Sequence, residues 1–136
     1  MGSSAEGYAI ASLDELGEGP GFRKVRTAPG VSAFGVNAVV LPAGYDGRPH
    51  DHEEQEELSF VHSGTLEMDL GDGTTHRLEP GTFARVDPQT VRLMRNVGDT
   101  DAVYVCVGGK DGYVGRDGRL PEGATGRWGP GGAGSG

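Results

Sequence analysis

The chain has 136 residues, which fits one domain and leaves no room for two. Twenty acidic side chains against twelve basic ones give a net charge of −8, and no basic stripe interrupts the acidic sequence. Such a chain repels phosphate backbones, so nucleic acid is excluded as an expected partner. The single cysteine, Cys106, excludes an intrachain disulfide and a cysteine-based metal cluster.

No stretch reaches the roughly 18 apolar residues that span a bilayer, so no membrane partner is expected. The N-terminus lacks a charged region followed by an apolar core, so we expect no signal peptide and a cytoplasmic protein. Cys106 lies in the apolar run 102–107, which favours a buried structural thiol over a nucleophile.

The first part of the chain predicts little regular structure. Residues 1–12 are small and polar, and we expect them to be loose. A helical turn is predicted at 13–16 with Ser12 as its N-cap, and a run of Gly and Pro ends it. We therefore treat residues 1–21 as an N-terminal arm.

From Phe22 onward the pattern is that of β-strands. Short apolar runs alternate with Gly, Pro and Asp turns, and Gly71-Asp72-Gly73 predicts a hairpin. Many short strands without a long amphipathic helix predict an all-β sandwich or barrel over residues 22–120. The expected strands cover 31–41, 58–62, 65–70, 74–78, 83–86, 91–95 and 102–107.

The C-terminal part is rich in glycine, since 12 of the 26 glycines fall at or after Gly108. Such a segment cannot bury enough apolar surface to offset the entropy cost of ordering it. We expect a flexible tail over residues 121–136.

Two histidines and a glutamate form the pattern that carries the chemistry. His50 and His52 are two residues apart, so on a strand both imidazoles lie on one face and can meet one metal ion. Glu57 follows five residues later, where an uninterrupted strand would put it on the opposite face. The polar stretch 53–56 can instead turn the chain, so that Glu57 starts the next strand and points inward. Two imidazoles and a carboxylate then form a facial triad with open coordination positions.

The spacing around these residues resembles the first motif of the cupin family. That motif is a Gly, five residues, His-x-His, three or four residues, a Glu, six residues and a Gly. Its fixed positions fall on Gly44, His50, His52, Glu57 and Gly64. The resemblance covers about residues 31 to 107 and implies a double-stranded β-helix, or jelly roll, closed around one pocket. It also implies one divalent metal ion, for which Fe, Mn, Ni, Co and Zn all suit these ligands.

The second cupin motif resembles residues 81–96 but departs from the family form. Gly81 and Asn96 match it, while Asp87 and Gln89 stand where the family has Pro and Gly. Arg92 stands where the resemblance implies the fourth metal ligand, a histidine.

Arg92 leaves two interpretations of the site. A protonated guanidinium has no lone pair to give, so Arg92 cannot replace the histidine as a ligand. In the first interpretation, which we favour, the metal keeps three protein ligands and Arg92 clamps an anionic substrate beside it. In the second, Arg92 pairs with Glu57 in a site that has lost its metal. Both require Arg92 to point inward; an exposed Arg92 would need a one-residue register slip.

Three further residues join Arg92 as candidate substrate contacts. Met94 shares its strand face, Tyr45 follows a turn near the histidines, and Asn37 is a polar residue inside an apolar run. We do not expect His62 or His76 to be metal ligands, because both are predicted on outward faces.

The sequence therefore predicts a metal-binding cupin with a pocket for a small molecule. It would be an oxygenase or isomerase acting on a small anionic or oxygenated substrate. The alternative is a non-catalytic ligand-binding or sensing barrel with a partial or empty metal site, and a structural or storage barrel is a weaker third. A homodimer is expected, because pairing between subunits covers exposed sheet edges.

Overall fold

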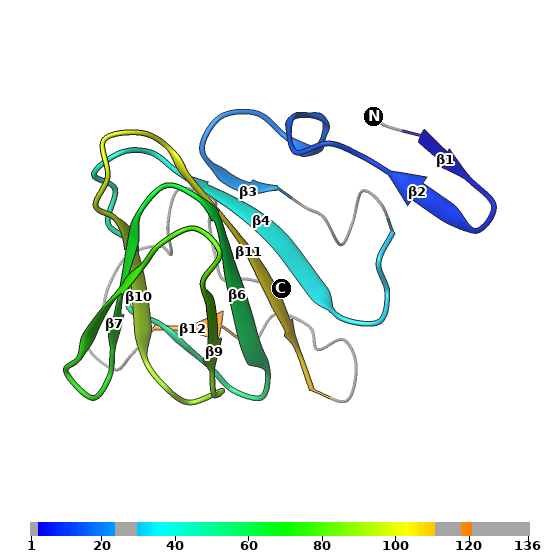
Figure 1. Cartoon of the computed structure of the whole chain (residues 1–136). Helices are drawn as coiled ribbons and strands as arrows, with labels where there is room; N and C mark the ends of the chain where they lie inside the picture. Colours follow the sequence, from blue (N-terminus) through cyan, green and yellow to red (C-terminus); the bar gives the residue numbers. More distant parts are fainter. Residues whose placement is uncertain (1–2, 24–29, 111–117, 121–136) are drawn as a thin grey trace.

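The computed structural model describes residues 3–23, 30–110 and 118–120. Two antiparallel sheets face each other (Figure 1), one of five strands in the order β3-β4-β11-β6-β9 and one of three in the order β10-β7-β8. Because the chain crosses repeatedly from one sheet to the other, this is a jelly roll, and the all-β prediction is confirmed. The strands of the large sheet are β3 (Gly21–Arg23), β4 (Gly35–Leu41), β6 (Glu56–Ser63), β9 (Phe83–Val86) and β11 (Ala102–Gly109). Those of the small sheet are β7 (Leu66–Leu70), β8 (Thr75–Leu78) and β10 (Arg92–Asn96).

The connection between β4 and β6 extends the small sheet beyond β10. Isolated bridges join Asp46 to Arg95 and His50 to Arg92, so this connection runs antiparallel to β10. It ends in the two-residue strand β5 (Asp51–His52), which pairs with β12 (Gly118–Arg119) from the C-terminal part of the chain. The predicted histidine pair therefore lies directly beside β10.

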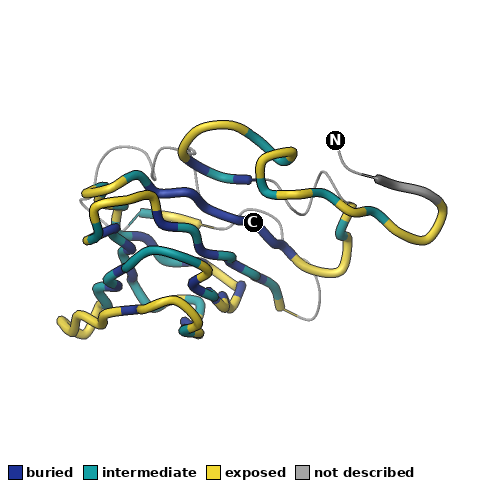
Figure 2. Tube along the Cα trace, turned by 45° about the horizontal axis from the view of Figure 1, so that its top comes forward, coloured by how far each residue is buried: buried dark blue, intermediate teal, exposed yellow. Residues whose placement is uncertain are grey.

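The core fills the space between the two sheets, and buried residues alternate with less buried ones along β10 and β11. In β6 the odd-numbered residues from Glu57 to Val61 are buried, and Figure 2 shows β4 buried along its whole length. The main apolar cluster consists of Val39, Leu41, Val61, Leu66, Met68, Leu78, Val86, Met94, Ala102, Tyr104 and Cys106.

Most predicted strands are confirmed, with ends that differ by a few residues. The predicted hairpin turn at 71–73 joins β7 to β8, with a backbone hydrogen bond of 2.9 Å from Leu70 N to Thr74 O. The predicted turn at 13–16 is the 3-10 helix η1 (Asp14–Leu16), and Ser12 Oγ accepts a 3.3 Å bond from Glu15 N.

One prediction about the N-terminus was wrong. Residues expected to be loose form the hairpin of β1 (Ser3–Ala5) and β2 (Tyr8–Ile10), which projects away from the two sheets (Figure 1). The cause is local, because Gly7 at φ 97° supplies a tight two-residue turn. The predicted tail, residues 121–136, lies outside the described residues. Among the residues described, no helix is long and apolar enough to cross a membrane.

Gly64, at the end of β6, is a glycine for two separate reasons. Its φ is +83°, and an added Cβ would lie 2.6 Å from Cβ of Ala102. Gly64→Ala should therefore lower the free energy of unfolding by about 3 kcal/mol, from overpacking added to backbone strain. Gly73→Ala is the matched control, since φ there is +86° but the space is open, and it should cost about 1 kcal/mol in urea denaturation. Equal decreases in the free energy of unfolding in Gly64→Ala and Gly73→Ala would show that close packing against Ala102 does not contribute.

Candidate metal centre

His50, His52 and Glu57 come together between the two sheets. His50 immediately precedes β5, His52 ends it, and Glu57 is the second residue of β6. The three are 5%, 0% and 6% exposed, and one ligand atom of each lies within 4.8 Å of the others. Glu57 points inward because the chain turns over residues 53–56, as predicted, so that β6 starts at Glu56.

The distances suit a metal ion. His52 Nε2 lies 3.1 Å from Glu57 Oε2. Ligand atoms about 2.1 Å from a common metal are about 3.0 to 3.4 Å apart in octahedral or tetrahedral geometry. The rings of His50 and His52 meet edge to face with centroids 5.2 Å apart. Two neutral imidazoles and a carboxylate form a donor set that fits a divalent transition metal.

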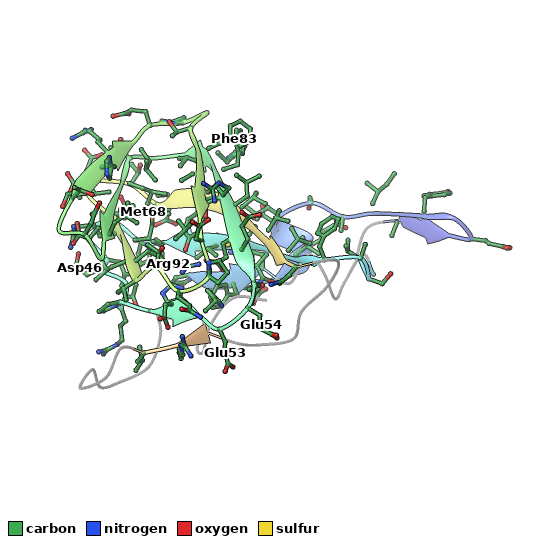
Figure 3. The ribbon with its side chains drawn as sticks, turned by 90° about the horizontal axis from the view of Figure 1, so that it is seen from below. Asp46, Glu53, Glu54, Met68, Phe83 and Arg92 are labelled. Carbon is green, nitrogen blue, oxygen red and sulfur yellow. The ribbon has the colours of Figure 1, made fainter. Side chains whose placement is uncertain are left out.

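Arg92 lies inside this centre, opposite His50 across the bridge between the connection and β10. His50 N and Arg92 N each donate to the other's carbonyl, at 3.0 and 2.9 Å. The Arg92 side chain is buried, and Figure 3 shows it in the interior, whereas Glu53 and Glu54 lie at the outer edge. The register slip that would expose Arg92 is therefore excluded.

The guanidinium of Arg92 is an ion-pair partner of Glu57. Arg92 Nη2 donates to Glu57 Oε1 at 2.9 Å, which is the contact of the second sequence interpretation. Glu57 Oε2 remains directed at His52, so the carboxylate can offer one oxygen to a metal while Arg92 holds the other. The pair is therefore compatible with a three-ligand metal site, in which Arg92 would orient a ligand.

Three backbone carbonyls surround Nη1, the other terminal nitrogen of the Arg92 guanidinium. Arg92 Nη1 lies 3.5, 3.3 and 2.7 Å from the carbonyl oxygens of Asp87, Pro88 and Thr90. Both terminal nitrogens are thus engaged, and the buried Nε has no hydrogen-bond partner among the described residues. A fork-like grip on a substrate through both terminal nitrogens would require these contacts to break.

A small cavity adjoins the centre. It offers about 20 Å³ of room, enough for about one water molecule. Its wall includes His50, Glu57 and Arg92 on the polar side and Met68, Met94 and Tyr104 on the apolar side. A substrate larger than a few atoms would therefore need side chains to move, and the flexible thioethers of Met68 and Met94 are the ones suited to do so.

The other predicted pocket residues fall into two groups. Met94 lines the cavity, as expected for the inward face of β10. Asn37 and Tyr45 are not in the cavity wall: Asn37 is buried opposite Cys106 in the sheet, and Tyr45 packs against the core. His62 and His76 are both exposed and take no part in the cluster.

Comparison with known proteins agrees with this geometry. Residues 37–108, more than half of the chain, match the family described as Cupin domain. The chain belongs to the cupin family. A search of curated protein sequences found no match.

Several solved structures share the fold of this cupin. A cupin protein from Bacteroides fragilis superposes with a TM-score of 0.64 at 23% identity, covering 76% of this chain and 85% of that one. A sugar phosphate isomerase of the cupin superfamily from Silicibacter pomeroyi gives 0.68 at 24%, covering 83% and 82%. The DMSP lyase DddQ from Ruegeria pomeroyi gives 0.59 at 23%, covering 68% and 46%. At these identities the likeness establishes the fold alone.

Two polar contacts of the cupin's centre were missed from the sequence. Gln55 is 0% exposed, and its Nε2 lies 3.3 Å from Nδ1 of His52. Cys106 is buried as predicted, but its thiol also donates to Glu57 Oε2 at 3.3 Å. Burial, followed by the nearby Glu57 carboxylate, raises the pKa of this thiol well above its usual range, so the thiol remains a donor. The alternation of β6 and β11 could have placed Cys106 near Glu57, but no sequence signal marks Gln55.

The acid stability of the metal-free protein should depend on His50. Burial is the main cause that lowers the pKa of His50 from 6.5 to about 4, and the charge of Arg92 adds to it, while Glu57 opposes it. Between these pH values the unfolded chain binds more protons than the folded chain. The contribution of neutral His50 to the free energy of unfolding is therefore complete above pH 6.5 and is lost as the pH drops toward 4. The loss should reach about 3 kcal/mol in urea denaturation. His50→Asn should flatten this dependence and exposed His62→Asn should not; an unchanged slope in His50→Asn would contradict the assignment.

Proposed function

We propose that this cupin binds one divalent metal ion through His50, His52 and Glu57. The observation that carries the proposal is the convergence of three buried ligand atoms within 4.8 Å. Burial keeps His50 neutral at pH 7, so its lone pair is available for coordination. When bound, the metal would supply a Lewis acid or a platform for dioxygen beside the cavity.

We further propose that the ligand of this site is a small anionic or oxygenated molecule, and that an enzyme built on it would be an oxygenase or isomerase. A divalent ion, the Arg92 cation and the Glu57 carboxylate together leave a net positive charge in a buried space. Such a charge is costly unless an anion compensates it. Arg92 is one of the residues of the cavity wall, and its buried Nε–H is a donor suited to that anion. The similar structures include an isomerase and a lyase, so the fold does not choose the reaction.

The second candidate is a non-catalytic ligand-binding or sensing barrel with a partial or empty metal site. The observation that favours it is the Arg92–Glu57 ion pair, which compensates the buried carboxylate without a metal. The cavity beside the pair is also too small for a typical metabolite without rearrangement.

Elemental analysis of protein purified without added metal separates these candidates. We expect about one divalent ion per chain, and its loss in His52→Ala. His76→Ala, an exposed histidine outside the cluster, is the matched control and should keep the metal. Full metal content in His52→Ala would refute the ligand assignment, and a metal-free parent that also fails to take up added ions would favour the second candidate.

The homodimer, the small-molecule partner and the cytoplasmic location stay predictions. Light scattering of the purified protein tests the first directly, since a monomer at working concentration would contradict it.

A further inference from the structure

We propose that Gln55 is the positioning residue of the metal centre: its amide holds Nδ1 of His52, and position 108 is a glycine to leave room for that amide. The inference rests on the proposed function, because it concerns how His52 is presented to a metal. Metal-bound histidines commonly use their second ring nitrogen to bind a fixing partner.

The first observation is the direction of the Gln55 side chain. Gln55 lies in a polar turn whose neighbours Glu53, Glu54 and Glu56 are exposed, yet it is 0% exposed itself. Its Nε2 lies 3.3 Å from Nδ1 of the equally buried His52. A long polar side chain that turns into the interior from a solvated loop is costly unless its contacts there compensate. The contact with Nδ1 of His52 is one interaction that compensates the burial of the Gln55 amide.

The second observation concerns the two nitrogens of His52. Nε2 faces Glu57 Oε2 at 3.1 Å and is the atom that a metal would use, so Nδ1 must then carry the ring proton. Nδ1–H needs an acceptor, and a glutamine amide provides one through its oxygen. Without a metal, the amide nitrogen can instead donate to Nδ1 while Nε2–H donates to Glu57. The oxygen and nitrogen ends of an amide have nearly the same shape. Gln55 can therefore bind Nδ1 in both the metal-bound and the metal-free site, if its amide group rotates by half a turn.

The third observation is the glycine that faces this amide. Gly108 lies in β11 directly opposite Glu57 in the sheet register. A Cβ at this position would overlap the Oε1 atom of Gln55 far inside van der Waals contact. The backbone of Gly108 does not have the positive φ that favours glycine, so space for Gln55 is the reason that remains.

Zn²⁺ titration against a competing chelator tests the role of Gln55. Gln55→Met keeps the length of the side chain but loses the amide, and the Zn²⁺ affinity should fall by about tenfold to a hundredfold. Gln55→Glu keeps an acceptor for Nδ1–H, and its affinity should stay within about threefold of the parent or rise. In the Zn²⁺-loaded parent, NMR should show a slowly exchanging Nδ1 proton on His52, which exchanges faster in Gln55→Met.

A double-substitution cycle tests the role of Gly108. Gly108→Ala should reduce Zn²⁺ affinity as much as Gln55→Met does, because it expels the amide. In a Gln55→Ala background the space is free, so the same substitution should change the affinity by less than about twofold. Gly98→Ala is the matched control, since its added Cβ would meet its nearest neighbour, Asn96 Oδ1, at 3.4 Å.

The outcomes distinguish this inference from the function on which it rests. A parent protein that binds no Zn²⁺ overturns the proposed function and this inference together. A parent that binds Zn²⁺ while Gln55→Met binds equally well overturns the inference alone. Equal losses from Gly108→Ala in both backgrounds overturn the role assigned to the glycine.

Discussion

Arg92→Met should lower the free energy of unfolding of the metal-free protein by about 3 to 5 kcal/mol. Glu57 is 6% exposed, and its carboxylate is paired with the positively charged guanidinium of Arg92, with 2.9 Å between Glu57 Oε1 and Arg92 Nη2. Methionine fills similar space but leaves the carboxylate buried without a counter-charge, and the cost of that uncompensated charge dominates. The carbonyl oxygen of Thr90 also loses the Arg92 donor at 2.7 Å, whereas those of Asp87 and Pro88 keep backbone donors.

A divalent ion should recover much of this loss. In the proposed site the metal takes over as the counter-charge of Glu57, so the ion stabilises the variant more than it stabilises the parent. The measurement is urea denaturation of both proteins in chelator and in excess Zn²⁺. We expect the difference in the free energy of unfolding between the parent and Arg92→Met to shrink by more than half when Zn²⁺ is present.

Arg77→Met is the control for removing an arginine that pairs with a glutamate. Arg77 Nε and Glu79 Oε1 are 2.8 Å apart, but the two side chains are 62% and 58% exposed, so water screens the pair and its contribution to stability should be small. If Arg92→Met costs no more than Arg77→Met, the buried pair with Glu57 does not stabilise the fold.

The architecture and the three candidate ligands follow from short-range patterns in the sequence. Alternation along β6 and β10 fixes which residues point inward, so the burial of Glu57 and Arg92 could be predicted before any partner was known. The turn over 53–56 could be inferred because an inward Glu57 requires it. Arg92 points inward, as predicted, but the favoured interpretation made it the clamp of an anionic substrate. In the structure its terminal nitrogens instead contact Glu57 and carbonyl groups.

The contacts that could not be predicted join residues far apart in the chain or depend on side-chain torsions. Gln55 contacts His52 because of the side-chain torsions that it adopts within a polar turn. Gly108, which leaves room for this side chain, lies on another strand, β11. The cage of carbonyls around Arg92 depends on the path of residues 87–90, where Asp87 and Gln89 already depart from the family motif. No periodicity in the sequence reports such geometry.

Arg92→His should increase the affinity for Zn²⁺ by at least about tenfold, or about 1.4 kcal/mol. Position 92 lies directly opposite His50 across the backbone bridge, is buried and belongs to the cavity wall. An imidazole there would add a fourth ligand to the three that we propose, and the substitution also removes a fixed positive charge from beside the ion. Both effects act in the same direction.

Arg92→Gln separates the two effects, because it removes the charge without supplying an imidazole. The affinity gained by the glutamine variant measures the relief of charge repulsion, and the further gain in the histidine variant measures ligation. Equal Zn²⁺ affinities in the two variants would mean that position 92 does not reach the metal. A weaker affinity in both would mean that Arg92, by holding Oε1 of Glu57, orients the carboxylate for coordination more than its charge opposes the ion. That last result would make the arginine a working part of a three-ligand centre, in which one fixed cation replaces one ligand.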